Sequence, residues 1–333
     1  MSKSKFFVAF APVFCLLIAM AVAAEEKQPE AKSRRFEFSY AGEIRNVPAG
    51  EKARVWIPIP PTTADQTVEL MKADFPAEAG KNRETKFGNE MYYFEAQPKP
   101  GKPIKFAVSY LIKRKTVLGF TQRGEAGKSS LADEDLRVFL REDRKVPITG
   151  RPLELIKGFS FPQTRVDEAR LLYNTVERYM SYDKSKPGYG DGDVLWACDN
   201  RTGNCTDFHS LFISLSRSRG IPAKFQMGFP LPEERGSGTI KGYHCWAQFY
   251  DKRLGWIPVD ISEADKHPEL KEFYFGNLTE NRVEFTTGRD IDLTPKQDGE
   301  PLNYFVYPYV EVDKKRWGKD NLEMSFGYAD REN

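Results

Sequence analysis

The chain of 333 residues lacks several features that would each point to a particular class of protein. Charge of neither sign dominates, because 50 lysines and arginines stand against 48 acidic residues, so the sequence has no electrostatic footprint for nucleic acid. Its four cysteines include no pair spaced two to four residues apart, which is the usual sign of a structural zinc site. The three histidines leave few candidates for a catalytic base. We find no internal repeat, glycine-rich phosphate loop or low-complexity tract, and no long apolar run after residue 24.

The N-terminus predicts an export signal. Lys3 and Lys5 precede an apolar run over 6–24, and Ala21-Val22-Ala23 matches the small-residue pattern of a signal-peptide cleavage site. We therefore expect a signal peptide and a protein that is periplasmic or extracellular after cleavage. The alternative is that the apolar segment is not cleaved and anchors the protein in the membrane.

Residues 34–116 contain short runs in which apolar and polar side chains alternate. In the first of them Phe36, Phe38 and Tyr40 share one face, and turn signals such as Pro98-Lys-Pro-Gly101 separate the runs. This pattern predicts a small antiparallel β-sandwich.

Cys205 stands where a helix is about to begin. Gly203 and Asn204 predict a turn, and apolar residues then recur at the spacing of a buried helical face: Phe208, Leu211, Phe212 and Leu215. A thiol in the first turn of a helix lies near unpaired backbone N–H groups and the positive end of the helix dipole, which both favour the nucleophilic thiolate. Downstream, His244 opens one strand-like segment and Asp260 closes another. Cysteine, histidine and aspartate in this order are the residues of a thiol acyl-transfer site.

These residues lie in longer strings that together resemble the transglutaminase-like superfamily of papain-like cysteine enzymes. The strings are Arg201–Asp207, Arg217–Ala223, Tyr243–Tyr250 and Gly255–Asp260. The resemblance implies an α+β fold, in which a papain-like transglutaminase core follows an N-terminal antiparallel β-sandwich domain. It also implies that Cys205 is the nucleophile, that His244 is the base and that Asp260 is the acid that orients it.

The expected organisation combines this resemblance with the composition of the remaining segments. It consists of a signal peptide at 1–24, a spacer at 25–33, the β-sandwich domain at 34–116, a connecting region at 117–160, the catalytic domain at 161–313 and a C-terminal tail at 314–333. Within the connecting region, Ser130 followed by Asp133 is typical of a helix start, and the helix is expected to run through Leu140.

Aromatic residues beside the proposed triad are candidates for the substrate cleft or the oxyanion site. If 244–250 is a strand, His244 and Trp246 share one face and Cys245 points the other way. Trp246 and Tyr243 are then expected to wall the cleft. The indole N–H of Trp196, nine residues before the nucleophile, is a candidate second donor to an oxyanion beside the Cys205 N–H.

Several readings of the same residues stay open. His209 follows Cys205 by one helical turn and is an alternative base, although no orienting acid lies near it in the sequence. Cys198 and Cys245 are either a disulfide that leaves Cys205 free or two buried, inert thiols. A zinc site built from these three cysteines, His209 and His244 is a further alternative, disfavoured by their spacing.

The sequence thus predicts thiol-dependent acyl transfer or hydrolysis at protein or peptide amides, whether glutamine side chains or backbone amides. The acceptor is water or an amine, and the mechanism requires no cofactor and no metal. The main alternative is a catalytically idle transglutaminase-like module that binds or scaffolds partners in the cell envelope.

Overall fold

The computed structural model describes residues 30–120 and 132–332. The signal peptide and most of the spacer predicted above lie outside the described residues. Within them, no helix is long and apolar enough to cross a membrane.

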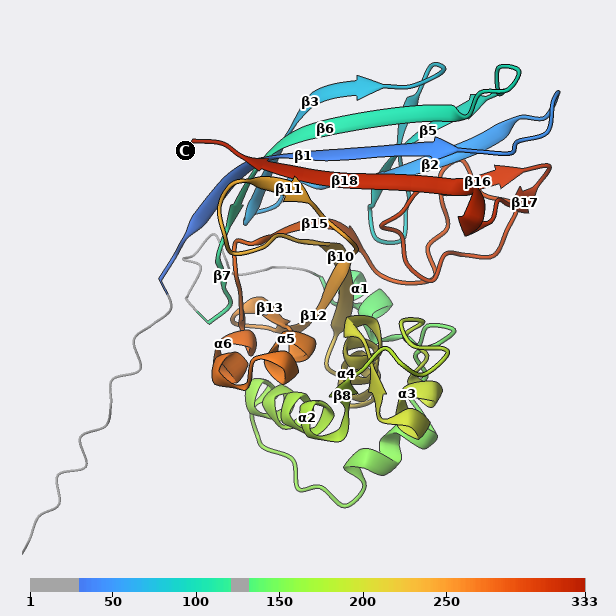
Figure 1. Ribbon diagram of the computed structural model, residues 1–333. Helices are drawn as coiled ribbons and strands as arrows, with labels where there is room; N and C mark the ends of the chain where they lie inside the picture. Colours follow the sequence, from blue (N-terminus) through green and yellow to red (C-terminus); the bar gives the residue numbers. More distant parts are fainter. Residues whose placement is uncertain (1–29, 121–131, 333) are drawn as a thin grey trace, which may run out of the picture.

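Two five-stranded antiparallel sheets form a sandwich, drawn at the top of Figure 1. Alternation of buried and more exposed side chains along Ser33–Ile44 and Ile104–Lys115 places one face of these two long strands in the shared core, as the sequence predicted for Phe36, Phe38 and Tyr40. The first sheet has the order β11(Ser237–Thr239), β18(Leu322–Asp330), β1(Ser33–Ile44), β6(Ile104–Lys115), β3(Gln66–Asp74). The second has the order β17(Lys315–Arg316), β16(Tyr309–Val312), β2(Ala53–Ile59), β5(Glu90–Ala96), β4(Gly80–Arg83).

The C-terminal residues belong to this sandwich and are not the tail expected for 314–333. β18 pairs with β1 from Leu322 opposite Ile44 to Asp330 opposite Phe36. Phe326 is the one fully buried side chain of β18, so its sequence shows little of the alternation that marks a strand. Hydrogen bonds to β1 determine its conformation.

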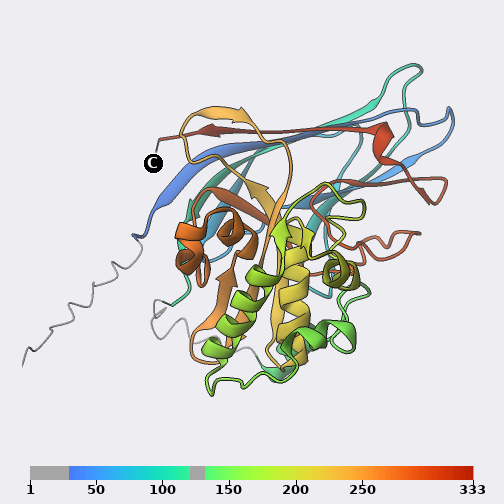
Figure 2. The ribbon, with the colours of Figure 1, turned by 60° about the horizontal axis from the view of Figure 1, so that its bottom comes forward.

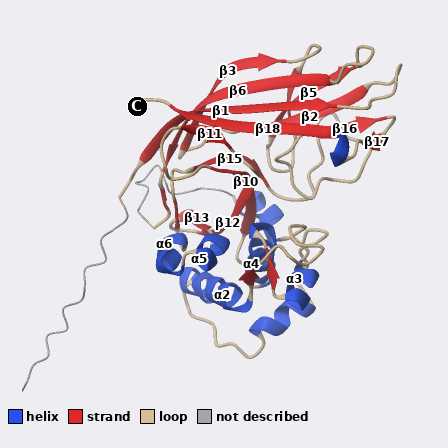
Figure 3. Cartoon of the chain, in the orientation of Figure 1, coloured by secondary structure: helices blue, strands red, loops and turns tan. Residues whose placement is uncertain are grey.

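A four-stranded antiparallel sheet with helices against it forms the second part of the molecule, the lower half of Figures 1 and 3. Its strands, in spatial order, are β13(Gly255–Val259), β12(His244–Asp251), β10(Ala223–Pro230) and β15(Arg282–Thr287). The helices are α2(Arg165–Tyr179), α3(Val194–Asn200), α4(Cys205–Ser218), α5(Ile261–Lys266) and α6(Lys271–Tyr274). Figure 2 shows α2 and α4 side by side, with α4 packed on β10 and β12.

Short elements complete the fold. They are β7(Val117–Leu118) paired with β14(Asn277–Leu278), β8(Ser181–Tyr182) paired in parallel with β9(Thr202–Gly203), α1(Asp133–Leu136) and the 3₁₀ turns Arg137–Leu140, Arg151–Ile156, Pro268–Leu270 and Lys319–Asn321. The helix expected to open at Ser130 begins at Asp133 and turns into a 3₁₀ helix at Arg137, while Ser130 itself lies outside the described residues.

The helix that carries the cysteine forms as its sequence predicts. Asn204 caps α4, and its predicted apolar face, Phe208, Leu211, Phe212 and Leu215, is fully buried. Gly220, at φ +70°, follows its last turn in the left-handed conformation that ends many helices. Every residue from Cys205 to Arg217 is buried, so α4 is the central helix of the core and holds Cys205 rigidly.

A close approach of two strands positions the histidine. His244 lies opposite Gly228 on β10, and a Cβ atom at Gly228 would come 1.8 Å from the carbonyl oxygen of Val283 on β15. Glycine is therefore required at 228, since any side chain would separate β10 from β15 beside His244.

Candidate active site

A reciprocal cap holds the turn before Cys205. The side chain of Asn204 accepts a hydrogen bond from the Thr206 N–H at 2.8 Å, and Asp207 accepts one from the Asn204 N–H at 2.9 Å. The Cys205 N–H takes no part in the hydrogen bonds of this cap. The thiol is buried to 3% exposure beneath a cavity of about 290 Å³, lined by Tyr182, Lys184, Tyr189, Gly190, Asp191, Asn204, Cys205, Gly242, Tyr243, Tyr304, Tyr307 and Lys319.

Asp207 has a structural role beyond the helix dipole. Its carboxylate also accepts hydrogen bonds from the backbone N–H groups of Gly190 and Gly192, at 2.7 and 2.9 Å. Burial raises the pKa of Asp207 to about 6, although these backbone hydrogen bonds lower it. Asp207 thereby fastens the loop that forms one rim of the cavity to the start of α4.

His244 and Asp260 form a buried pair next to Cys205. The Nε2 atom of His244 lies 2.7 Å from Oδ2 of Asp260, and His244 acts on the Cys205 thiol by lowering its pKa. His244 is the first residue of β12, and Asp260 follows the neighbouring strand β13 and caps α5. The pairing of β12 with β13 therefore brings the histidine and the carboxylate together.

Arg282 is a third partner of this pair that the sequence reasoning missed. Its Nη1 donates to Oδ2 of Asp260 at 2.9 Å, and its guanidinium lies over the ring of Trp246 at 5.0 Å. Oδ1 of Asp260 accepts from the Ser262 hydroxyl and the Glu263 N–H, each at 3.2 Å. The sequence did contain a signal for this contact: Arg282 is the first residue of an otherwise buried strand, and a charged side chain that is buried there requires a partner of opposite charge.

The electrostatics favour a thiolate beside a charged imidazole. Burial opposes ionisation of Cys205, but hydrogen bonds from Cys245 and His244 and the charge of His244 outweigh it and lower its pKa well below the ordinary value. Burial likewise opposes protonation of His244, yet the charge and hydrogen bond of Asp260, together with Cys205, raise its pKa to about 10. The pKa of Asp260 is lowered despite burial, chiefly by His244 and then by Arg282.

His209 is placed as a structural residue. Its Nε2 accepts a hydrogen bond from the Ile261 N–H at 3.0 Å, so this nitrogen carries no proton in the neutral ring. The side chain has no solvent exposure, and burial lowers its pKa. His209 thus ties α4 to the segment that carries Asp260.

Of the three aromatic candidates, Tyr243 lines the cavity at Cys205, and Trp196 and Trp246 do not. The Tyr243 hydroxyl lies 2.8 Å from the Thr206 hydroxyl and accepts from the Asn204 amide at 3.1 Å. The Trp196 indole N–H donates to the Pro187 carbonyl at 3.1 Å, which corrects its assignment as an oxyanion donor. Trp246 is fully buried, its indole N–H donates to the Gln226 side chain at 2.6 Å, and its ring packs against the Arg282 guanidinium. It therefore does not line the cleft, contrary to what was expected from the sequence.

Cys198 and Cys245 do not form the disulfide considered above, because both are free and buried, as is Cys205. The thiol of Cys245 faces α4, with Sγ 3.8 Å from the Thr206 hydroxyl and 3.7 Å from Nδ1 of His209. The pKa of the Cys205 thiol is lowered by both Cys245 and His244, while burial raises the pKa of Cys245 well above its ordinary value. Burial raises the pKa of Cys198 to about 11.

Among the described residues, 30–120 and 132–332, one group of side chains that could bind a metal ion lies close together. His244, Asp260 and Glu263 each place one ligand atom within 4.8 Å of the others. This group differs from the cysteine–histidine set considered for zinc. The guanidinium of Arg282 on the same Asp260 carboxylate places a positive charge where a cation would bind, so this donor set fits a metal poorly.

The site thus combines a thiol at the start of a helix with a histidine at the start of one strand and a carboxylate just after the neighbouring strand. Residues 155–261 match the family model of the transglutaminase-like superfamily. The resemblance drawn from the sequence is therefore confirmed: the chain contains a transglutaminase-like core.

The chain is also similar to individual proteins, to different degrees. An uncharacterised protein of Haemophilus influenzae is 33% identical over 177 residues. The match covers 44% of this chain and 48% of that protein, so the chain spans about half the length of this relative. The structure of a candidate cysteine protease from Cytophaga hutchinsonii has a TM-score of 0.57 at 15% identity, covering 91% of this chain and 94% of that one. The periplasmic domain of TgpA from Pseudomonas aeruginosa has a TM-score of 0.37 at 15% identity, covering 73% and 96%.

Proposed function

We propose that the protein catalyses thiol-dependent acyl transfer or hydrolysis at protein or peptide amides. The observation that carries the proposal is the buried pair of His244 and Asp260, joined at 2.7 Å, together with the Cys205 thiol whose pKa His244 lowers. In this proposal Cys205 is the nucleophile, His244 the general base and Asp260 the acid that holds the imidazole in one orientation.

The reaction proceeds in two stages. The thiolate attacks the amide carbonyl, the C–N bond breaks, and the imidazolium of His244 gives its proton to the departing amine. This leaves a thioester on Cys205. In the second stage water or an amine, such as a lysine side chain, attacks the thioester, His244 accepts a proton, and the C–S bond breaks.

The developing oxyanion needs hydrogen-bond donors at the start of α4. The Cys205 N–H is one, since the first N–H groups of a helix have no partner within it. The Tyr243 hydroxyl is the second in this proposal, because it lies in the cavity beside Asn204 and Thr206 and carries its own proton.

The pH dependence of Cys205 alkylation tests the proposal. Because the pKa of Cys205 is lowered well below the ordinary thiol value, labelling by iodoacetamide at pH 6 is expected to be faster than for an ordinary thiol and to rise less steeply up to pH 8. In His244→Ala the stabilising charge and hydrogen bond are lost while burial remains. The pKa should then return to about 8.5 or higher, which slows labelling at pH 6 about 100-fold or more.

The labelled fraction would be followed by mass spectrometry after brief exposure at each pH, with Cys205→Ala as the control that assigns the site. Wild-type labelling that rises only near pH 8.5 would contradict the activated thiol. That result would support the idle module that binds partners in the cell envelope.

We further propose that the protein is exported, because residues 1–24 have the composition of a signal peptide. Expression of the full chain in a bacterial host is expected to yield an N-terminus at Glu25 in the periplasmic or extracellular fraction. N-terminal sequencing and intact mass check this, and an intact chain that still begins at Met1 would rule out cleavage.

A further inference from the structure

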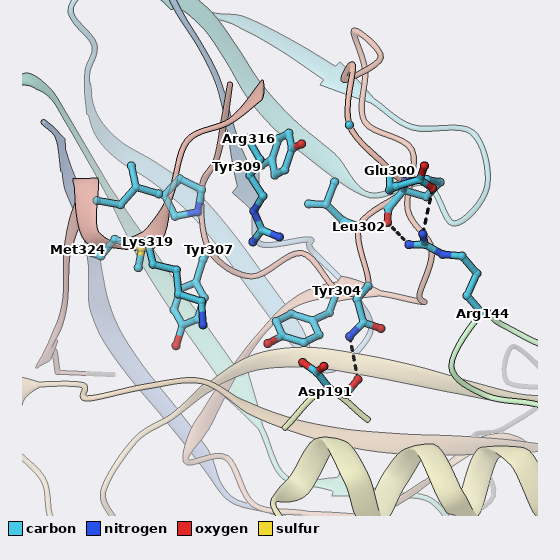
Figure 4. A pocket seen from close by; sticks show the side chains of 15 residues that line it. Arg144, Asp191, Glu300, Leu302, Tyr304, Tyr307, Tyr309, Arg316, Lys319 and Met324 are labelled. Atoms are coloured by element: carbon cyan, nitrogen blue, oxygen red, sulfur yellow. Dashed lines mark hydrogen bonds and ion pairs between the residues drawn. The ribbon is translucent and has the colours of Figure 1, made fainter. Parts of the chain in front are cut away.

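A second cavity opens beside the one at Cys205. It has a volume of about 580 Å³ and is lined mainly by segments 299–304, 307–309 and 316–324, with Arg144 and Asp191 from the core (Figure 4). Four residues line both cavities: Asp191, Tyr304, Tyr307 and Lys319. The two cavities therefore adjoin one another, and a chain bound at Cys205 can extend into the larger one.

Tyr243 links the two cavities. Its ring lies 5.6 Å from that of Tyr304 and 6.0 Å from that of Tyr307, and its N–H donates to the Tyr307 hydroxyl at 3.3 Å. Farther from Cys205 the lining becomes largely apolar, with Leu302, Tyr309, Leu322 and Met324. Such a surface favours an apolar side chain over water.

The charges along the larger cavity do not balance. Arg144 is neutralised by Asp290 and Glu300, at 2.8 and 3.2 Å, and Asp191 by Lys145 at 2.6 Å. Arg316 and Lys319 are exposed, and neither forms an ion pair with another described residue. The guanidinium of Arg316 lies 5.7 Å from the centre of the Tyr309 ring, which holds it at the apolar wall. The positive side chains of Arg316 and Lys319 are therefore available to bind a negatively charged ligand.

We propose that this cavity binds a segment of the peptide substrate next to the reactive amide, with an apolar side chain against the tyrosine and leucine wall and a carboxylate on Arg316 and Lys319. The protein would then select acidic peptides. This inference rests on the proposed function, since it takes Cys205 as the point at which the substrate is attacked.

Alkylating peptides test the cavity without requiring acyl transfer. The probes are bromoacetyl-Gly-Leu-Glu-Glu amide and its neutral counterpart bromoacetyl-Gly-Leu-Gln-Gln amide, in which the Cys205 thiolate displaces bromide. Four residues reach roughly 13 Å. The ratio of their labelling rates is measured at pH 8, where even an ordinary thiol is partly ionised.

In the wild type the acidic probe is expected to react about three- to tenfold faster, the range expected for two exposed ion pairs. The ratio should fall to near one in Arg316→Ala/Lys319→Ala and in 0.5 M NaCl, because salt screens exposed charges. Lys315→Ala is the matched control. Lys315 is exposed on the same strand and does not line the cavity, so the ratio should not change.

Each outcome bears on one proposal. A ratio near one in the wild type, or a high ratio that survives in Arg316→Ala/Lys319→Ala, would overturn the acidic subsite. Slow iodoacetamide labelling at pH 6 together with a high probe ratio at pH 8 would instead overturn the activated thiol and leave the subsite standing as a binding site.

Discussion

Replacing Cys205 with alanine is expected to abolish turnover of amide substrates, with kcat/KM falling by on the order of 10³-fold or more. The thiolate is the atom that forms the thioester, and no other described thiol can replace it. Cys245 is fully buried, and burial raises its pKa well above the ordinary value, so it stays protonated. The measurement is release of ammonia or of a new amino terminus from a panel of glutamine-containing acidic peptides, with and without an added primary amine.

His244→Ala is expected to lose a comparable factor, because the base and the proton donor to the leaving amine are the same imidazole. Asp260→Asn should lose no more than His244→Ala, since the base survives in a poorer orientation. Cys198→Ala is the matched control and should retain turnover, because Cys198 does not line the cavity at Cys205. Wild-type-like turnover by Cys205→Ala would end the covalent mechanism.

The sequence was sufficient for the parts of the site that local rules determine. The cap at Asn204, the apolar stripe from Phe208 to Leu215 and the glycine after the helix lie within one short segment, and the structure contains each of them. The alternation in β1, the strand that begins at His244 and the strand that ends just before Asp260 are equally local patterns. They are visible because helix and strand periods are properties of a few neighbouring residues.

Contacts between distant segments could not be predicted in this way. β18 is a strand because β1 is its partner, and its own residues alternate weakly. The conformation of an irregular loop has the same effect at shorter range: the Pro187 carbonyl, nine residues before Trp196, accepts the hydrogen bond of the indole that was assigned to an oxyanion. The cavity with Arg316 and Lys319 exists because the C-terminal segment returns to the sandwich beside the core.

Arg282 is the most consequential of these distant contacts, and Arg282→Met is expected to destabilise the fold strongly. The substitution keeps much of the volume but removes the guanidinium from the fully buried Asp260 carboxylate. Breaking one partner of a buried ion pair leaves an uncompensated charge, which here costs about 3 kcal/mol of unfolding free energy. This is the lower end of the usual range, because His244, Ser262 and the Glu263 N–H still bind Asp260.

For a chain of this length the loss corresponds to a fall in Tm of roughly 5 °C, measured by thermal denaturation. Arg253→Met is the matched control: its side chain is 79% exposed, and the substitution should leave Tm nearly unchanged. Arg282→Lys should recover part of the loss, because it restores the charge but not the geometry of the guanidinium. A Tm for Arg282→Met within about 1 °C of the wild type would mean that His244, Ser262 and the Glu263 N–H are sufficient to stabilise the Asp260 carboxylate. Arg282 would then have no role in holding the carboxylate beneath the histidine.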